Sequence, residues 1–331
     1  MILLAGIRSE APLAMVAQAL AGQGREFRIV HQRDVAAYRL DWSIDGDGIR
    51  GKLTLGDEIV ELEAVTGVYL RLMDDMRLPE LDGLPDGDPQ RKHARGFHDA
   101  LYRWAEIAPA RVVNRTDMQG SNGSKPYQAQ LIAAVGFLVP PTLITSDPET
   151  VLEFRARHER IIYKSISGLR SVVRTFEDAD LARLNRLGWC PVQFQAELQG
   201  QNIRVHVIGD DVFATAIEST HVDYRYANLD GGRATLKATQ LPPDITDRCL
   251  VLARTLGLAF AGIDLFLTGA GDYYCFEVNP QPGFSFFEVN SGQPIASAVA
   301  SFLAGPQSAR NAELARRAPC VAAANPQEKY R

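Results

Sequence analysis

The sequence contains no closely spaced cysteines and no cluster of histidines. Cys190, Cys249, Cys275 and Cys320 are scattered along the chain, and no CxxC pair occurs among them. A disulfide framework or a thiolate zinc site needs cysteines at regular, short spacings, so neither is expected to organise this protein. The six histidines show no HExxH or similar spacing. We interpret all ten residues as ordinary core or surface residues.

Long hydrophobic runs and an excess of basic charge are also absent. No apolar run approaches the roughly 18 residues of a membrane-spanning helix. The N-terminus has no basic n-region, and Arg8 and Glu10 interrupt its apolar run, so it predicts a buried strand and not a signal peptide. Thirty-five basic and 40 acidic residues give a net charge of -5, which argues against nucleic acid as the main partner. We therefore expect a cytoplasmic protein without a membrane or nucleic-acid partner.

The composition is that of a globular protein. The chain has 331 residues, of which 46% are hydrophobic and 23% are charged. These values are close to globular averages, and the length suggests two or three domains.

The first third of the chain predicts a parallel α/β layer. The apolar run 2–7 predicts a buried strand, 10–22 a helix and 27–31 a second strand. Strand, helix and strand in this order favour a parallel sheet. Asp-Gly and Gly-Asp pairs in 41–62 predict antiparallel hairpins, and 67–72 predicts a further buried strand.

A surface loop is expected over 74–92, because this stretch is rich in Asp, Pro and Gly. A helix over about 93–107 and a strand over 111–114 should follow, with a domain boundary near 115. A further helix is expected over about 125–136.

The remainder predicts an α+β organisation. We expect a small unit from about 142 to 200, a strand-rich region from about 202, and a tail from Gly305 that is at most partly ordered. The expected strands are 142–145, 161–165, 171–175, 191–194, 203–209, 212–219, 262–269 and 273–279, and the expected helices are 244–258 and 293–304.

Three oxygen-bearing side chains near the end of the chain indicate a metal site. Asp264 lies within an apolar strand, where an uncompensated carboxylate is costly. Glu277 and Asn279 are two residues apart on the next strand and therefore project from one face. Such a set suits a hard cation such as Mg²⁺, with waters and phosphates completing the coordination. The alternative is an ordinary hairpin with half-exposed polar positions.

Two lysines are candidates for binding phosphate. Lys125 opens a helix after the Gly/Ser-rich run 120–124, and Lys164 precedes the small-residue run 165–171. Loop N–H groups beside a lysine can hold a phosphate. Taken alone, each lysine is better explained as a solvated surface charge, and the first run is not a P-loop, because Pro126 follows the lysine.

The order of these motifs resembles the ATP-grasp superfamily, particularly RimK-type peptide ligases and graspetide synthetases. The resemblance covers roughly 115–304 and includes Lys125, Lys164 and five further motifs. In chain order these are the turn GFLVPPT at 136–142, the linker strand VQFQAE at 192–197, NIRVHVIG at 202–209, GID at 262–264 and EVNPQPGF at 277–284.

The resemblance implies an α/β (α+β) ATP-grasp fold with ATP and Mg²⁺ as cofactors, Mn²⁺ being an alternative metal. The implied division is an N-terminal parallel α/β pre-ATP-grasp domain at 1–115, a central subdomain at 116–200, a C-terminal subdomain at 201–304 and a tail at 305–331.

It also implies residue roles. Arg204 would steady the transferred phosphoryl group, although a structural ion pair is the alternative for this residue. Glu197 would face the ribose or is a surface glutamate. The implied nucleotide-binding residues are Lys125, Lys164, Ser167, Gly168, Gln193, Phe194, Gln195 and Glu197, and the implied metal ligands are Asp264, Glu277 and Asn279. The substrate candidates are Tyr224, Arg225, Arg170 and Arg71, and for the first two a polar turn is the alternative.

The implied activity is a carboxylate–amine or carboxylate–hydroxyl ligase that acts through an acyl phosphate on a peptide, protein or amino-acid substrate. Two alternatives stay open: a small-molecule kinase of the same fold, and an ATP-binding regulatory module without turnover. The complete set of Asp264, Glu277, Asn279 and Arg204 argues against the module. A homodimer is also left open.

Overall fold

The computed structural model describes residues 1–46, 48–166, 173–219 and 234–306. The chain forms two compact units. The first consists of Met1–Arg115 together with the segment that begins at Ala300, and the second is Thr116–Val299. Within the described ranges, no helix combines the length and apolar character needed to cross a membrane.

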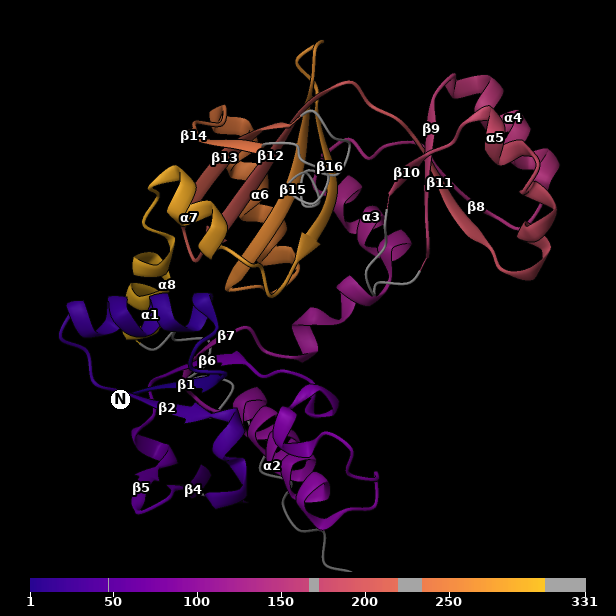
Figure 1. Cartoon of the computed structure of the whole chain (residues 1–331). Coiled ribbons are helices and arrows are strands. Elements are labelled where there is room, and N and C mark those ends of the chain that lie inside the picture. The colour runs from indigo at the N-terminus through magenta and orange to yellow at the C-terminus, as the bar shows by residue number, and fades with distance from the viewer. Residues whose placement is uncertain (47, 167–172, 220–233, 307–331) are drawn as a thin grey trace, which may run out of the picture. The chain divides into compact units, whose positions relative to one another are not determined.

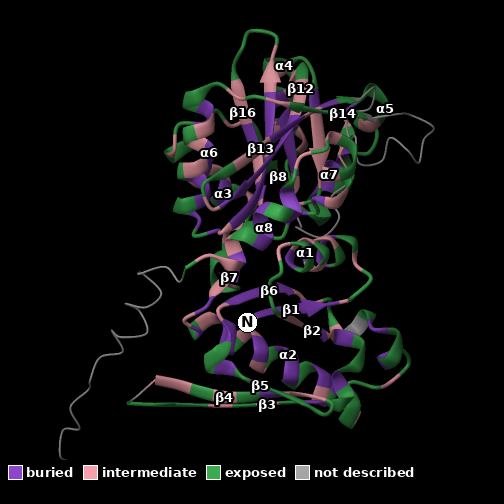
Figure 2. Cartoon of the chain, turned by 90° about the vertical axis from the view of Figure 1, so that its left-hand side faces the viewer, coloured by how far each residue is buried: buried purple, intermediate pink, exposed green. Residues whose placement is uncertain are grey.

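The first unit contains the predicted parallel layer. Its sheet has the order β2-β1-β6-β7, and all neighbouring strands are parallel. Helices α1 and α2 cover opposite faces of this sheet (Figures 1 and 2). The elements are β1 (Ile2–Gly6), α1 (Ala11–Gly22), β2 (Phe27–His31), β6 (Gly67–Arg71), α2 (Pro89–Ile107) and β7 (Arg111–Val113).

The predicted hairpins form a separate antiparallel sheet in the same unit. Its strands are β3 (Tyr38–Asp45), β4 (Gly48–Leu55) and β5 (Glu58–Glu61). Figure 2 shows α2 between this sheet and the parallel one. Leu53 and Val60 on the hairpins and Trp104 on α2 belong to one buried cluster, so a single core joins this sheet to α2.

Helix α2 begins four residues before the predicted position. The Asp88 carboxylate accepts a hydrogen bond of 2.8 Å from the Gln90 N–H, and Pro89 occupies the first helical position. Both features are typical of a helix start. The abundance of Asp, Pro and Gly in 74–92 therefore concealed a capping signal at its end.

The second unit contains a small antiparallel sheet with the order β10-β9-β11-β8. Helix α4 packs on it, and Phe154, Phe176 and Phe194 form its core. The elements are β8 (Thr142–Thr145), α4 (Pro148–His158), β9 (Ile161–Lys164), β10 (Arg174–Thr175), α5 (Asp178–Leu181) and β11 (Val192–Ala196).

A five-stranded antiparallel sheet with the order β14-β13-β12-β15-β16 forms the rest of the second unit. Helices α3 and α6 pack on one face, where Ile132 and Leu252 meet Val205 and Ile263. The elements are α3 (Lys125–Ala134), β12 (Gly200–Ile208), β13 (Asp211–Ser219), β14 (Ala234–Thr239), α6 (Pro243–Thr255), β15 (Phe260–Thr268), β16 (Tyr273–Asn279) and α7 (Ser285–Ser291). Helix α8 (Ile295–Ala304) begins in this unit, and its residues from Ala300 belong to the first unit.

Two elements of this unit were not predicted from the sequence. Strand β14 and the short helix α7 were missed because neither has a long periodic pattern of apolar residues. Short 3₁₀ helices complete the described secondary structure: η1 (Gln32–Ala37), η2 (Leu62–Ala64), η3 (Asp75–Arg77), η4 (Pro79–Leu81), η5 (Asp117–Gly123) and η6 (Leu184–Trp189).

Candidate active site

The face of the five-stranded sheet that points away from the α3–α6 core carries the charged residues. In the strand register, Arg204 on β12 lies opposite Asp264 on β15, and Asp264 lies opposite Glu277 on β16. Two residues further along both strands, Gly262 on β15 lies opposite Asn279 on β16. Three neighbouring strands thus bring these side chains together although Arg204 is 60 residues from Asp264 in the chain.

A register shift between Asp264 and Leu265 shapes this face. Leu265 pairs with Cys275, so Phe276 is an extra residue on β16. Cys275 is consequently buried in the α3–α6 core, while the Phe276 ring packs on Phe266 at 5.4 Å. A bulge of this kind redirects side chains locally. Because Phe276 is the extra residue, Glu277 still pairs with Asp264 although Cys275 pairs with Leu265.

The charged side chains form one connected network. Arg204 Nη1 donates to Asp264 Oδ1 at 2.5 Å, and Lys125 Nζ lies 3.9 Å from Glu277 Oε2. Asn279 Nδ2 donates to Asp264 Oδ2 at 3.3 Å and to Glu277 Oε1 at 3.5 Å. Two cations therefore balance two carboxylates, and one amide joins the carboxylates.

This arrangement fits a hard divalent cation. Oxygens of both carboxylates converge on the same Asn279 nitrogen, so a cation beside that point would have both within reach. Rotation of the amide would present its oxygen instead. No group of three or more His, Cys, Asp or Glu side chains suited to a metal occurs in the described part of the chain. The protein thus offers two carboxylates and one amide, and Mg²⁺ would keep positions for water and phosphate oxygens.

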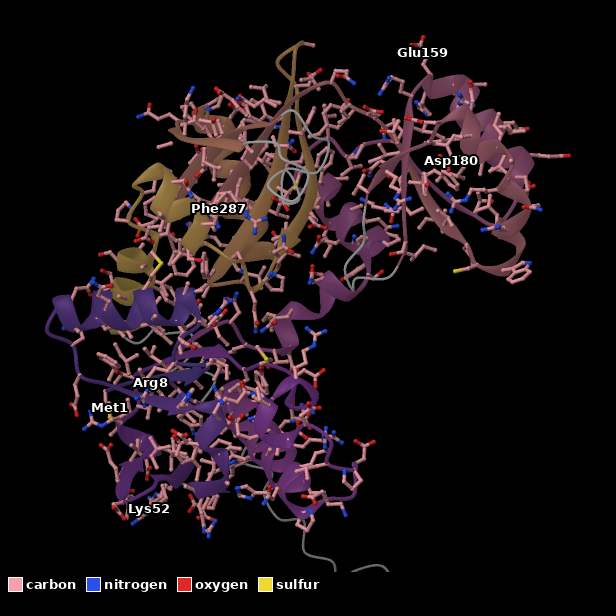
Figure 3. The ribbon with its side chains drawn as sticks, viewed as in Figure 1. Met1, Arg8, Lys52, Glu159, Asp180 and Phe287 are labelled. Carbon is pink, nitrogen blue, oxygen red and sulfur yellow. The ribbon has the colours of Figure 1, made fainter. Side chains whose placement is uncertain are left out.

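Arg204 is held in place by residues that sequence analysis did not single out. A Cβ atom on Gly262 would lie 2.6 Å from Arg204 Nη2, so only glycine leaves room for the guanidinium. The ring centroid of Phe287 on α7 also lies 5.6 Å from Arg204 Cζ. Figure 3 labels Phe287. The Gly of the GID motif was visible in the sequence, but its steric role needed the register of β12 and β15.

His206 lies beside Arg204 on the same face of β12 and is completely buried. Its ring packs against Phe287 at 5.1 Å and Phe260 at 6.0 Å. Burial holds the pKa of His206 well below its usual range, and the Arg204 cation lowers it further. A neutral imidazole can therefore support Arg204 without adding a third positive charge to the network.

The small sheet of the second unit presents a second polar face. Gln193 on β11 lies opposite Lys164 on β9, and both are on the face that also carries Gln195. Gln195 Nε2 donates to Thr142 Oγ1 at 3.0 Å. Gln193 is buried, and its Oε1 atom has no partner among the described residues. An unpaired buried carbonyl oxygen is costly, so this atom is an exception among the buried polar groups of the small sheet.

Two residues expected to bind the nucleotide have other contacts. The Phe194 side chain is in the core of the small sheet, where its ring centroid lies 5.9 Å from that of Phe176. On the face that carries Gln193, Phe194 can therefore contact a nucleotide only through its main chain. Glu197 pairs with Arg160 through two contacts of 3.2 Å. The Glu197 side chain is only 9% exposed, so it is not a freely solvated surface carboxylate, and its role at the ribose stays a prediction.

One predicted substrate residue belongs to the first unit. Arg71 in the first unit donates through Nε to both Glu10 oxygens at 2.8 Å. Ser167, Gly168, Arg170, Tyr224 and Arg225 lie outside the described residues.

Gln128 on α3 was missed from the sequence. It is 2% exposed and bonds both main-chain groups of Val278, the residue between Glu277 and Asn279. The only sequence signal was its position three residues after Lys125, which places both on neighbouring parts of one helix face.

Comparison with known proteins supports the interpretation of this site. Residues 174–303 match the model of the RimK-like ATP-grasp domain. A probable alpha-L-glutamate ligase of Pseudoalteromonas translucida is 31% identical over 215 residues, which are 62% of this chain and 70% of the relative. One of Cellvibrio japonicus is 34% identical over 112 residues, 34% of this chain. That match spans only 36% of the relative's length, about a third.

Solved structures show the same fold over nearly the whole chain. The macrocyclase MdnC of Microcystis aeruginosa, bound to precursor peptide MdnA, has a TM-score of 0.74 at 24% identity and covers 92% of this chain and 99% of its own. The ATP-grasp ligase PsnB, in complex with a precursor variant, Mg and ADP, has a TM-score of 0.71 at 27% identity, with coverages of 92% and 97%.

The fold and the charged network together define an ATP-grasp protein, as the order of motifs predicted. The chain belongs to the RimK-like ATP-grasp family.

Proposed function

We propose that this protein is an ATP-dependent ligase that activates a carboxylate of a peptide substrate and joins it to an amine or a hydroxyl group. The observation that carries the proposal is the network of Arg204, Asp264, Glu277 and Asn279 on one sheet face, with Lys125 of α3 beside Glu277. Phosphoryl transfer requires positioning and charge neutralisation above all, and this network supplies both.

Each residue has a distinct task in the proposed reaction. Asp264, Glu277 and Asn279 would hold Mg²⁺, which when bound neutralises phosphate charge. Lys125 and Lys164 would hold the α- and β-phosphates. Arg204 would bind the γ-phosphoryl oxygens while a substrate carboxylate oxygen attacks the γ-phosphorus and ADP leaves. The resulting acyl phosphate is then attacked at its carbonyl carbon by an amine or hydroxyl, which loses its proton, and inorganic phosphate departs.

The peptide substrate is proposed from the named relatives. MdnC was crystallised with its precursor peptide, and an ATP-grasp ligase of Chryseobacterium gregarium with ADP and a leader and core peptide. The latter has a TM-score of 0.75 at 21% identity. These likenesses concern the fold, and they make peptides with acidic side chains the first substrates to test.

A trapping experiment tests the chemistry. The protein is supplied with Mg²⁺·ATP, hydroxylamine and a pool of acidic peptides and amino acids. We expect a hydroxamate whose formation requires ATP, because hydroxylamine intercepts an acyl phosphate. A stable phosphate ester without hydroxamate would instead identify a kinase and refute the ligase proposal.

The affinity for ATP provides a second test of the proposal. Lys164→Ala should weaken ATP binding about tenfold to hundredfold, because a charge-assisted hydrogen bond in a partly dry site is worth about 1.5–3 kcal/mol. Lys92→Ala, at an exposed position on α2, is the matched control and should bind normally. Calorimetry measures both, and equal affinities of the two variants would show that Lys164 does not contact ATP.

A further inference from the structure

Gln128 bonds the strand that carries two of the proposed metal ligands. Its Nε2 atom donates to Val278 O and its Oε1 atom accepts from Val278 N, both at 2.9 Å. The side-chain amide thus pairs with the main chain as a neighbouring strand would. Gln128 and Val278 are both buried, so neither main-chain group can turn to water instead.

The contact matters because β16 is at the edge of its sheet. An edge strand has main-chain groups on its outer side that no strand pairs. On β16 the segment around α3 supplies the partners. Gln128 pairs with Val278, and Leu138 O accepts from Cys275 N at 2.9 Å. The outer side of β16 is therefore closed at two points by one short stretch of chain.

The same contact links the two halves of the proposed site. Val278 lies between Glu277 and Asn279 in the chain. Hydrogen bonds that hold the Val278 main chain therefore also hold the Cα atoms of Glu277 and Asn279 in place. Gln128 N donates to Ser124 O at 2.9 Å and closes the first turn of α3, and Lys125 lies in that turn. Lys125 Nζ is 3.9 Å from Glu277 Oε2. One amide therefore sets the spacing between the phosphate-binding lysine and the metal ligands.

We infer that Gln128 is a positioning residue that couples Lys125 to Glu277 and Asn279, so that Mg²⁺ and the nucleotide phosphates bind together. The inference rests on the proposed function, because it assumes that this network holds Mg²⁺ and nucleotide. Residues behind metal ligands commonly matter in this way, and their loss costs roughly 10- to 100-fold in metal affinity or activity.

The test compares Gln128→Met with a control in the first unit. Methionine keeps the volume of the side chain and removes both hydrogen bonds. Gln32 is the matched control, since it is equally buried and its amide bonds both main-chain groups of Met73. Binding of ADP to the full-length chain is measured by calorimetry over a Mg²⁺ series, and hydrogen exchange is measured across β16.

For Gln128→Met we expect the Mg²⁺ concentration for half-maximal ADP binding to rise roughly 10- to 100-fold, with faster exchange in β16. Gln32→Met should leave both quantities unchanged. If Gln128→Met does not fold, Gln128→Asn carries the test. Asparagine keeps a neutral amide but is one methylene shorter, so it cannot bond both main-chain groups of Val278, and it should shift the Mg²⁺ requirement in the same direction.

Two outcomes would overturn the inference, and they are distinguishable from failure of the proposed function. Faster exchange in β16 with an unchanged Mg²⁺ requirement would make Gln128 a purely structural residue. A change of equal size in Gln32→Met would show a general loss of stability. If the unaltered protein shows no Mg²⁺-dependent ADP binding, the proposed function fails first and the coupling falls with it.

Discussion

Replacement of Glu277 by alanine is expected to abolish Mg²⁺-dependent ADP release while leaving the fold intact. Glu277 provides one of the two carboxylates that converge on the Asn279 nitrogen. Without it Asp264 is the only carboxylate left in the network, and Arg204 already neutralises Asp264. The variant should therefore bind Mg²⁺ poorly, and the phosphates would lose the charge that neutralises them.

The fold should survive because Glu277 contributes little to stability. Its side chain is 24% exposed, and its ion pair with Lys125 is long, at 3.9 Å. At this distance the pair makes no hydrogen bond, so removing Glu277 breaks no charged hydrogen bond with Lys125. Thermal unfolding should consequently change by only a few degrees, whereas turnover should fall below detection.

Glu61→Ala is the control for this prediction. Glu61 is also a strand carboxylate beside a lysine, with Lys52 Nζ at 3.3 Å, but it lies in the antiparallel sheet of the first unit. Its removal should leave ADP release unchanged. Near-normal Mg²⁺-dependent ADP release by Glu277→Ala would rule out the assignment of Glu277 as a metal ligand.

Arg204→Lys is expected to lower kcat by about 10²- to 10³-fold, the loss that follows removal of one donor to a developing negative charge. Lysine keeps the positive charge beside Asp264 but lacks the planar guanidinium, which fits between Gly262 and Phe287. A lysine ammonium is a point charge that cannot bond Asp264 and a phosphoryl oxygen in one plane.

The effect on ATP affinity should be much smaller than the effect on kcat. An interaction made mainly in the transition state changes kcat, and uniform binding changes affinity. Hydroxamate formation and ADP release report kcat, and calorimetry reports affinity. Arg254→Lys is the control, because exposed Arg254 pairs with Asp210 at a similar distance of 2.6 Å. If Arg204→Lys weakened ATP binding and left kcat unchanged, Arg204 would be a structural or ground-state contact.

Local sequence patterns determined much of the fold. The apolar run 2–7 predicted β1, because a strand buried on both faces has no polar alternation, and the segment 27–31 predicted β2. Asp-Gly pairs predicted the hairpins of β3 to β5 because these residues favour tight turns. The start of α2 was misplaced since one capping aspartate among several is not distinguishable without its hydrogen bond to Gln90.

The sequence alone also selected the three predicted metal ligands of the candidate site, whereas Arg204 and Lys125 were selected through the resemblance of the motif order to ATP-grasp enzymes. Glu277 and Asn279 share a face by their spacing of two, and Asp264 was conspicuous as a carboxylate in an apolar strand. These inferences required only the alternation of a strand and the cost of burying charge.

Tertiary structure decided how these residues meet and what holds them. The register of β12, β15 and β16 placed Arg204 over Gly262, and the bulge at Phe276 turned Cys275 into the core. The pairing of Gln128 with Val278 joins residues 150 positions apart. Such contacts depend on strand register and helix docking, which are set by the packing of the whole unit and leave no local pattern in the sequence.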